Sequence, residues 1–233
     1  MLRVEQLQAF YGTSQALFDI NLHVDKGEVV TLIGRNGMGK TTTIHSIMGV
    51  VSASSGTITY QGKNITALPS FKVARLGLAL VPEGRQIFPN LTVNENLVAT
   101  AKNKRGNPNP WVREKILELF PPLAARLTSM GNLLSGGEQQ MLAIGRALMT
   151  NPELLLLDDA TEGLAPLVRK DIWSSLNALK NAGLSILIVD KNLNDLAGIA
   201  DRHYVIEKGN VVWQGNSKQL TADPTIKDKY LGV

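Results

Sequence analysis

The sequence predicts an α/β protein with a parallel core sheet and an inserted helical lobe. Four short apolar runs, at residues 29–33, 78–81, 154–157 and 186–189, are rich in strand-forming side chains and are separated by segments of helical patterning. Continuous apolar runs of this length are typical of parallel strands that are buried on both faces. Such an alternation of strand and helix is expected to form one sheet covered by helices.

Two further parts complete the expected architecture. Residues 92–149 have helical patterning interrupted by proline-rich turns, and we expect them to form a lobe between two sheet strands. The N-terminal segment and residues 203–207 and 211–214 have the pattern of antiparallel strands, and a Lys-Gly-Asn turn joins the last two.

A phosphate loop follows the first apolar run. Residues 34–41, GRNGMGKT, fit the pattern G-x-x-x-x-G-K-[ST] and lie between a predicted strand and a predicted helix that runs to about Val50. The glycines let backbone amides turn toward phosphate oxygens, and the helix N-terminus adds partial positive charge. Lys40 is expected to reach the β- and γ-phosphates of ATP, and Thr41 to offer its hydroxyl to Mg²⁺. A glycine-rich turn without a ligand is the alternative. The expected nucleotide-binding residues of this loop are Gly34, Arg35, Asn36, Gly37, Met38, Gly39, Lys40, Thr41 and Thr42.

Polar residues follow the other predicted strands. In open parallel sheets ligands gather at the carboxyl ends of the strands, so these residues are expected on one rim. Asp158 is a candidate Mg²⁺ ligand together with Thr41, and Asp159 is placed to orient an attacking water. A solvated acid at a strand end is the alternative for either carboxylate. The residues at these strand ends are Glu83, Asp158, Asp159, Asp190 and Lys191.

A second glycine-containing motif precedes the last part of the helical stretch. In residues 134–140, LSGGEQQ, Ser135 and Glu138 fit a capping box, which by itself explains the start of a helix. Capping alone does not call for two adjacent glycines, which allow the backbone to approach an anion closely. We therefore expect Ser135, Gly136, Gly137 and Glu138 to contribute to nucleotide binding.

Composition excludes several other classes of protein. With 233 residues, of which 44% are hydrophobic and 19% charged, the chain can bury a sizeable core. It has no cysteine, so a disulfide framework or a thiolate metal site is impossible. It has no run of roughly 18 apolar residues, so membrane association is expected only through a partner or the surface. The charge of +4 is spread along the chain, and its densest cluster, Lys102, Lys104 and Arg105, is expected to be a solvated surface rather than a nucleic-acid site.

GRNGMGKTT, LSGGEQQ and LLLLDD, in this order, resemble the Walker A, signature and Walker B elements of ABC-type ATPases, over essentially the whole chain. The resemblance implies a P-loop NTPase, with an ABC-type nucleotide-binding domain made of a RecA-like core sheet, an antiparallel β subdomain and an inserted helical lobe. Residues 1–233 would form a single domain, with a core lobe at 1–84 and 151–233 and a helical lobe carrying the signature at 85–150.

The resemblance also implies partners. In this family two nucleotide-binding domains pack head to tail, so Ser135, Gly136 and Gly137 would contact the γ-phosphate of an ATP held by a second, related or identical subunit. Tyr11 resembles the aromatic residue that stacks on adenine, although an ordinary half-buried tyrosine is an alternative. The protein would lie peripherally on the cytoplasmic face of the inner (plasma) membrane. It would bind transmembrane permease subunits there and serve a periplasmic solute-binding protein indirectly.

Within this family the chain most resembles the second ATP-binding subunit of branched-chain amino acid importers, the LivF subfamily. The segments that carry this resemblance are VPEGRQIFPNLTVNENL, GLAP and YLGV. In this subfamily Glu83 takes the place of the Q-loop glutamine, which makes it a candidate Mg²⁺ ligand and catalytic residue. Residues 83–97 would sense the nucleotide and receive a coupling helix of a membrane subunit, although their apolar members suit a lobe core equally well.

Three departures from the family pattern affect mechanism. Asp159 stands where a glutamate is usual, and its side chain is shorter by one methylene, which can misplace the carboxylate relative to the attacking water. Ala160 replaces a proline, and Glu162 stands where a small residue is common. Lys191 takes the position of the switch histidine, where it can neutralise phosphate charge but cannot accept a proton while charged. Nucleotide binding is therefore better supported than fast hydrolysis.

Several functions fit these features. The leading hypothesis is an ATPase in which ATP binding closes two domains, and hydrolysis helped by Mg²⁺, Lys40 and Asp159 reopens them. A nucleotide-dependent clamp or regulatory subunit with weak hydrolysis of its own is the second. The ATPase of a urea or amide importer is a third, because this type of subunit does not contact the transported substrate. An ABC ATPase of DNA repair or translation would carry tandem cassettes or long basic or coiled-coil insertions, which the sequence lacks.

Overall fold

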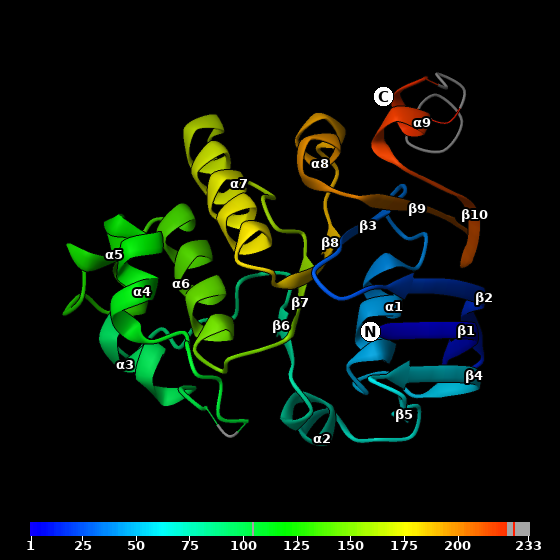
Figure 1. The fold of residues 1–233 in the computed structure, drawn as a ribbon, viewed down its shortest axis with the longest axis horizontal. Helices are drawn as coiled ribbons and strands as arrows, with labels where there is room; N and C mark the ends of the chain where they lie inside the picture. Colours follow the sequence, from blue (N-terminus) through cyan, green and yellow to red (C-terminus); the bar gives the residue numbers. More distant parts are fainter. Residues whose placement is uncertain (104, 223–225, 227–233) are drawn as a thin grey trace.

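One curled sheet runs through the protein, and its strands are antiparallel in one part and parallel in the other (Figure 1). The computed structural model describes residues 1–103, 105–222 and 226, and within them the strand order is β5-β4-β1-β2-β10-β9-β3-β8-β7-β6. Lys104 and the YLGV segment lie outside the described residues. The strands are β1 (Leu2–Tyr11), β2 (Ser14–Val24), β3 (Val29–Ile33), β4 (Ala53–Tyr60), β5 (Lys63–Asn64), β6 (Leu78–Val81), β7 (Leu154–Asp158), β8 (Ser185–Val189), β9 (Arg202–Glu207) and β10 (Asn210–Gly215).

The strands β9, β3, β8, β7 and β6 form the parallel part of the sheet. Three of them, β3, β7 and β8, are buried at every position, which agrees with their unbroken apolar sequences. The four apolar runs that the sequence predicted as parallel strands are therefore confirmed. Their carboxyl ends meet at one rim of the sheet.

The other part of the sheet is antiparallel and contains β1, β2, β4 and β5. The predicted hairpin of β9 and β10 is confirmed as an antiparallel pair. However, β9 runs parallel to β3, and β10 meets β2 in parallel at Asn210 and Asp19. The hairpin therefore joins the two parts of the sheet, a role that strand patterning alone did not predict.

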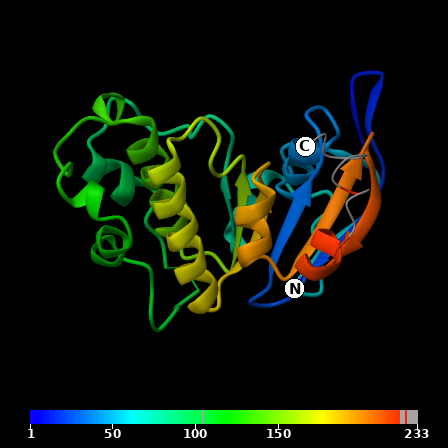
Figure 2. The ribbon, with the colours of Figure 1, turned by 90° about the horizontal axis from the view of Figure 1, so that it is seen from above.

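Helices gather at one end of the molecule and along the sheet. Figure 1 shows α3 to α6 grouped beyond the parallel strands, at the end away from the antiparallel strands, and Figure 2 shows α7 lying between this group and the sheet. Within the described residues, none of the helices combines the length and the apolar character that crossing a bilayer requires. The helices are α1 (Lys40–Ile47), α2 (Ser70–Arg75), α3 (Val93–Ala99), α4 (Arg113–Leu119), α5 (Pro121–Ala124), the 3₁₀ helix η1 (Gly131–Leu133), α6 (Gly136–Leu148), α7 (Pro166–Asn181), α8 (Leu193–Ile199) and α9 (Ser217–Ala222).

Two apolar clusters form the core, and alternate residues of β7 belong to different clusters. Leu155 and Leu157 pack in the cluster that extends to α6 and α7. Leu154 and Leu156 pack in the cluster that includes α1 and the antiparallel strands. Because β7 is held from both faces, the residues at its carboxyl end have little freedom of position.

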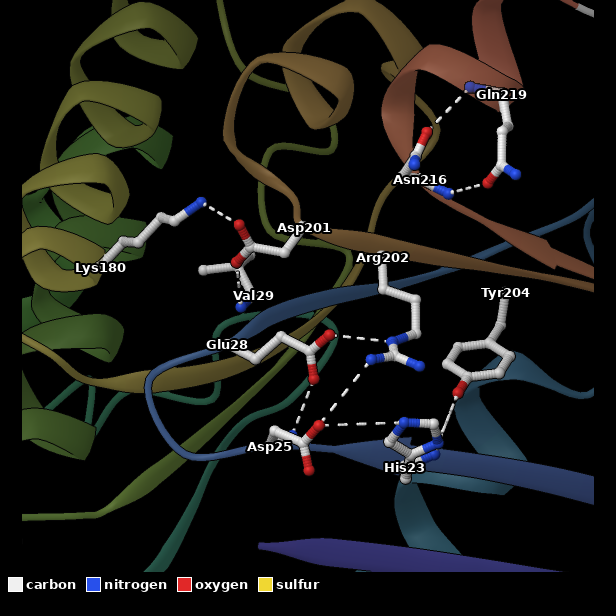
Figure 3. Close-up of polar contacts among 10 residues, drawn as sticks. All are labelled: His23, Asp25, Glu28, Val29, Lys180, Asp201, Arg202, Tyr204, Asn216 and Gln219. Atoms are coloured by element: carbon white, nitrogen blue, oxygen red, sulfur yellow. Dashed lines mark hydrogen bonds and ion pairs between the residues drawn. The ribbon is translucent and has the colours of Figure 1, made fainter.

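The amino end of β3 is anchored by polar contacts (Figure 3). The backbone N–H of Val29 donates to Asp201 Oδ2 at 2.9 Å, and Lys180 Nζ lies 2.7 Å from Asp201 Oδ1. Beside them, Arg202 Nε donates to Glu28 Oε1 at 2.8 Å. Each charge here has an opposite partner, so this network fixes the start of the strand that leads into the phosphate loop.

Candidate functional site

The phosphate loop connects β3 to α1 and fits closely against neighbouring strands. A Cβ atom at Gly34 would lie 2.3 Å from the carbonyl oxygen of Ile206 in β9, so only glycine fits there. Gly39 has a φ of 105° and begins α1 without a side-chain cap. The first N–H groups of the helix are therefore available to an anion such as phosphate. The helix ends at Ile47, slightly before the predicted Val50.

Lys40 folds back over the loop that precedes it. Its Nζ donates to the carbonyl oxygens of Gly34 at 2.8 Å and Arg35 at 2.9 Å. Burial lowers the pKa of Lys40, while the carboxylates of Asp159 and Asp158 act in the opposite direction. The ammonium group is thus held at the loop, next to the space that the loop encloses.

Asp158, at the end of β7, contacts the first turn of α1. Thr41 Oγ1 donates to Asp158 Oδ1 at 3.2 Å, which brings together the two residues that the sequence predicted as a pair. The other carboxylate oxygen, Oδ2, is buried and has no hydrogen-bond partner. Burial raises the pKa of Asp158, because an unpaired charge in the interior is unfavourable.

This arrangement fits a Mg²⁺ ion. Mg²⁺ prefers hydroxyl, carboxylate and phosphate oxygens, and Thr41 and Asp158 offer the first two beside a phosphate loop. A cation would also supply the opposite charge that the buried oxygen of Asp158 lacks.

A cavity of about 450 Å³ opens between the phosphate loop and the strand ends. It brings together loop residues, the predicted aromatic residue Tyr11, which is 52% exposed, and the strand-end residues Glu83 and Asp159. The side chain of Met38 contacts the turn between β9 and β10 instead, where its sulfur accepts a hydrogen bond from the Lys208 amide. The lining residues are Tyr11, Ala16, Asn36, Gly37, Gly39, Lys40, Thr41, Thr42, Glu83, Asp159, Glu162 and Val189.

Three carboxylates crowd together at the edge of this cavity. Oxygens of Glu83, Asp159 and Glu162 all lie within 4.8 Å of one another. Burial, and then the charges of Glu162, Asp158 and Glu83, raise the pKa of Asp159 to about 6. Asp159 also has a φ of 54°, a left-handed conformation that aspartate tolerates better than most residues. The chain therefore turns sharply directly after β7.

Glu162 was identified from the sequence only as a departure, and the structure brings it into the cavity. Its Oε1 lies 2.8 Å from Nζ of Lys191, which follows β8. This contact lowers the pKa of Glu162 and raises that of Lys191. The sequence does contain one signal for this contact: Glu162 and Lys191 have opposite charges and follow two strands that are neighbours in the sheet.

Asp190 has a structural role. Its Oδ2 accepts hydrogen bonds from the backbone N–H of Thr161 at 2.9 Å and from Thr161 Oγ1 at 2.7 Å, and both residues are buried. Asn192 donates to the other carboxylate oxygen. Asp190 thus ties the loop after β7 to the end of β8, between Glu162 and Lys191.

The LSGGE motif lies at the start of α6 and its residues do not line the cavity. The predicted capping box is confirmed: Ser135 Oγ accepts from the Glu138 amide at 3.3 Å, and Glu138 Oε2 accepts from the Ser135 amide at 2.8 Å. A Cβ at Gly137 would lie 2.4 Å from Val168 Cγ1, so this glycine also permits packing against α7.

Comparisons with known proteins agree with this geometry. A family model described as "ABC transporter" matches residues 17–162. The high-affinity branched-chain amino acid transport ATP-binding protein BraG of Pseudomonas aeruginosa is 43% identical over 232 residues, covering 100% of both chains. The lipopolysaccharide export system ATP-binding protein LptB of Haemophilus influenzae is 34% identical, covering 100% of this chain and 97% of LptB.

The structure is similar to solved ABC cassettes. A crystal structure of a nucleotide-free ATP-binding cassette from an ABC transporter superposes with a TM-score of 0.84 and 30% identity, covering 97% of this chain and 96% of the other. The predicted P-loop NTPase fold, with its mixed sheet and inserted helices, is therefore confirmed. The chain belongs to the ABC transporter family, as an ATP-binding cassette.

Proposed function

We propose that this chain is the ATP-binding and hydrolysing subunit of an importer for branched-chain amino acids. One observation carries the nucleotide part of this proposal: the part-buried hydrogen bond between Thr41 and Asp158 beside the phosphate loop, with the other oxygen of Asp158 buried and unpaired. The similarity to BraG over the full chain supports the transport role. The ATPase of a urea or amide importer remains the alternative, because this subunit does not meet the transported molecule.

The residues around the cavity have distinct parts in ATP hydrolysis. The loop amides and Lys40 hold the phosphates, and Tyr11 stacks on adenine. Thr41 and Asp158 would hold Mg²⁺, with Glu83 as a further ligand. When bound there, the ion neutralises phosphate charge. Asp159 faces the cavity from the end of β7 and orients the water that attacks in line.

A second subunit completes the site. Ser135, Gly136, Gly137 and Glu138 begin α6 outside the cavity, so a related or identical chain packed head to tail must bring its own copy of this motif to the γ-phosphate. In this arrangement the core lobe, 1–84 and 151–233, binds nucleotide. The helical lobe, 85–150, carries the signature.

Transport also requires membrane partners. The chain would attach to transmembrane permease subunits on the cytoplasmic face of the inner membrane, and a periplasmic solute-binding protein would deliver the substrate. A coupling helix of the permease would meet the segment that begins at Glu83. Closure of the two cassettes on ATP would drive the permease.

A clamp or regulatory subunit with slow hydrolysis is the second candidate. It is favoured by Asp159, whose side chain is shorter than the usual glutamate, and by Lys191, whose ammonium group is engaged by Glu162. The two candidates share the same nucleotide site and differ in the rate of the chemical step.

Replacing Lys40 with alanine tests nucleotide binding. Because a hydrogen bond to a charged group contributes about 1.5–3 kcal/mol, we expect Mg-ATP to bind roughly ten- to a hundredfold more weakly, measured by titration with a fluorescent ATP analogue and competition with ATP. Lys63→Ala, in the exposed strand β5, is the matched control and should bind like the unmodified chain. Equal affinity of Lys40→Ala and the control would refute the nucleotide site.

A further inference from the structure

We propose that Glu162 acts with Asp159 as a water-orienting carboxylate of ATP hydrolysis, and that Lys191 is the positioning residue that holds Glu162. This inference rests on the proposed ATPase function and adds a catalytic residue that the Walker and signature motifs do not contain. Glu162 and Lys191, which both depart from the family pattern, thereby have a role in hydrolysis.

Glu162 lies in the nucleotide cavity, close to Asp159. Its side chain lines the same cavity as Lys40 and Thr41, on the side where Asp159 leaves β7. Carboxylate oxygens of Glu162 and Asp159 lie within 4.8 Å of each other, so both can reach one water molecule. Glutamate extends one methylene further than aspartate and can recover the reach that Asp159 lacks. Small differences in reach matter, because misplacement by about 1 Å can cost a hundredfold in rate.

Buried contacts fix the loop that carries Glu162. Thr161, directly before it, is 1% exposed and donates two hydrogen bonds to Asp190, which is 3% exposed. Lys191, directly after Asp190, reaches back to Glu162 at 2.8 Å. In the neighbouring strands Asp158 pairs with Val189, so both loops start from the same level of the sheet. The ion pair itself is exposed, at 64% for the Lys191 side chain and 43% for that of Glu162, but the residue before each of them, Thr161 or Asp190, is buried and hydrogen-bonded.

Of the two residues in the ion pair, Glu162 can accept a proton and Lys191 can only position Glu162. A charged lysine has no acceptor, so Lys191 cannot take a proton from water. Its ammonium group binds Oε1 of Glu162, and an ionised carboxylate has about four acceptor sites, so Glu162 can still accept a hydrogen bond from water. The same positive charge offsets part of the repulsion among Glu83, Asp159 and Glu162. A glutamate next to a phosphate thus remains compatible with ATP binding.

Hydrolysis breaks one bond of ATP and forms one bond to water. The water oxygen bonds to the γ-phosphorus as the bond from this phosphorus to the bridging oxygen of the β-phosphate breaks. One proton of the water passes to the Glu162 carboxylate and is then lost to solvent. ADP leaves with the bridging oxygen, and inorganic phosphate is the second product.

Single-turnover ATP hydrolysis by the full chain tests this assignment, at protein concentrations at which two copies associate. Glu162→Gln keeps the size of the side chain but removes its basicity. General-base catalysis contributes about a hundred- to ten-thousandfold, and Asp159 shares it here, so we expect the rate to fall about tenfold or more. Mg-ATP affinity should stay within about twofold, because binding depends on the phosphate loop. Glu114→Gln is the matched control, since Glu114 forms an exposed ion pair of the same length, 2.8 Å, with Arg113.

Lys191 variants separate positioning from a general effect of charge. Lys191→Met should lower the rate as much as Glu162→Gln, and the double variant should be no slower than either single one, because the two residues act as a unit. Lys191→Arg should keep most of the rate of the unmodified chain, since arginine can also bind a carboxylate.

Other results would overturn the inference. A rate for Glu162→Gln equal to that of the Glu114→Gln control would remove Glu162 from the chemistry and leave the proposed function intact. The same conclusion would follow if Glu162→Gln changed Mg-ATP affinity and left the single-turnover rate unaltered. Failure of the unmodified chain to bind Mg-ATP would instead overturn both the inference and the proposed function.

Discussion

The two ends of the parallel strands differ in whether their charged side chains have partners of opposite charge. At the amino end, Asp201 contacts Lys180 and the amide of Val29, and Arg202 contacts Glu28, so each charge is matched (Figure 3). At the carboxyl end, carboxylates crowd together, one oxygen of Asp158 is buried without a partner, and the pKa values of Asp158 and Asp159 are raised.

The difference indicates which end serves structure and which serves function. A matched network can stabilise the fold without any ligand. A crowded group of acids lowers the stability of the empty protein and favours binding of a cation with its phosphate ligand. Substitutions at the two ends should therefore act in opposite ways on stability and on activity.

Asp158→Asn should have the largest effect on function. It keeps an oxygen that can accept the hydrogen bond from Thr41 but removes the negative charge that would hold Mg²⁺. We expect ATP hydrolysis to fall on the order of a hundredfold or more, as for the loss of other preorganised electrostatic contacts. A rate within threefold of the unmodified chain, at saturating Mg-ATP, would remove Asp158 from the site.

The same variant should be more stable without ligand. Burial raises the folded-state pKa of Asp158, so the ionised carboxylate costs stability at neutral pH, and the neutral amide of the Asp158→Asn variant removes this cost. The folded state binds the proton more tightly than the unfolded state, so the advantage should be full above the raised folded-state pKa of Asp158 and should shrink as pH falls from there to the ordinary carboxyl pKa. Urea unfolding of both proteins at pH 7 and at pH 4, without nucleotide, measures the difference in their free energies of unfolding at each pH.

Asp201→Asn tests the opposite end and should have a smaller effect. It weakens the contacts with Lys180 and Val29, but Asp201 is partly exposed, so we expect a loss of only about 1 kcal/mol in the free energy of unfolding. Mg-ATP affinity should stay unchanged, because the phosphate loop is at the other end of β3. Weaker nucleotide binding by this variant, in a titration of the folded protein, would show that the two ends are coupled.

Much of the fold follows from patterns that the sequence displays directly. The buried strands are unbroken apolar runs, and the start of α6 is a capping box with Ser135 and Glu138 in place. The contact between Thr41 and Asp158 follows from a motif at the end of one strand and an acid at the end of another. Local patterns of this kind depend on periodicity and on strand direction, which sequence encodes strongly.

The parts that were not predicted depend on contacts between distant segments. The bridging role of β9 and β10 requires knowing their neighbours, which strand periodicity does not specify. The ion pair of Glu162 with Lys191 depends on the sharp turn at Asp159 and on the buried link between Thr161 and Asp190. A left-handed aspartate and a buried hydrogen bond between two loops leave no periodic signal.

Asp159→Glu should have the smallest effect of these substitutions, and it tests which carboxylate at the carboxyl end orients the attacking water. If Glu162 already supplies a carboxylate with the longer reach, a glutamate at position 159 adds little, and we expect the single-turnover rate to change by less than about threefold. In a Glu162→Gln background that carboxylate is missing, so the same substitution should raise the rate clearly more than it does in the unmodified chain. An increase of tenfold or more in the unmodified chain would contradict the role of Glu162 and favour the slow clamp. In that case the short Asp159 alone limits hydrolysis, and the crowded carboxylates at this end of the sheet contribute to binding only.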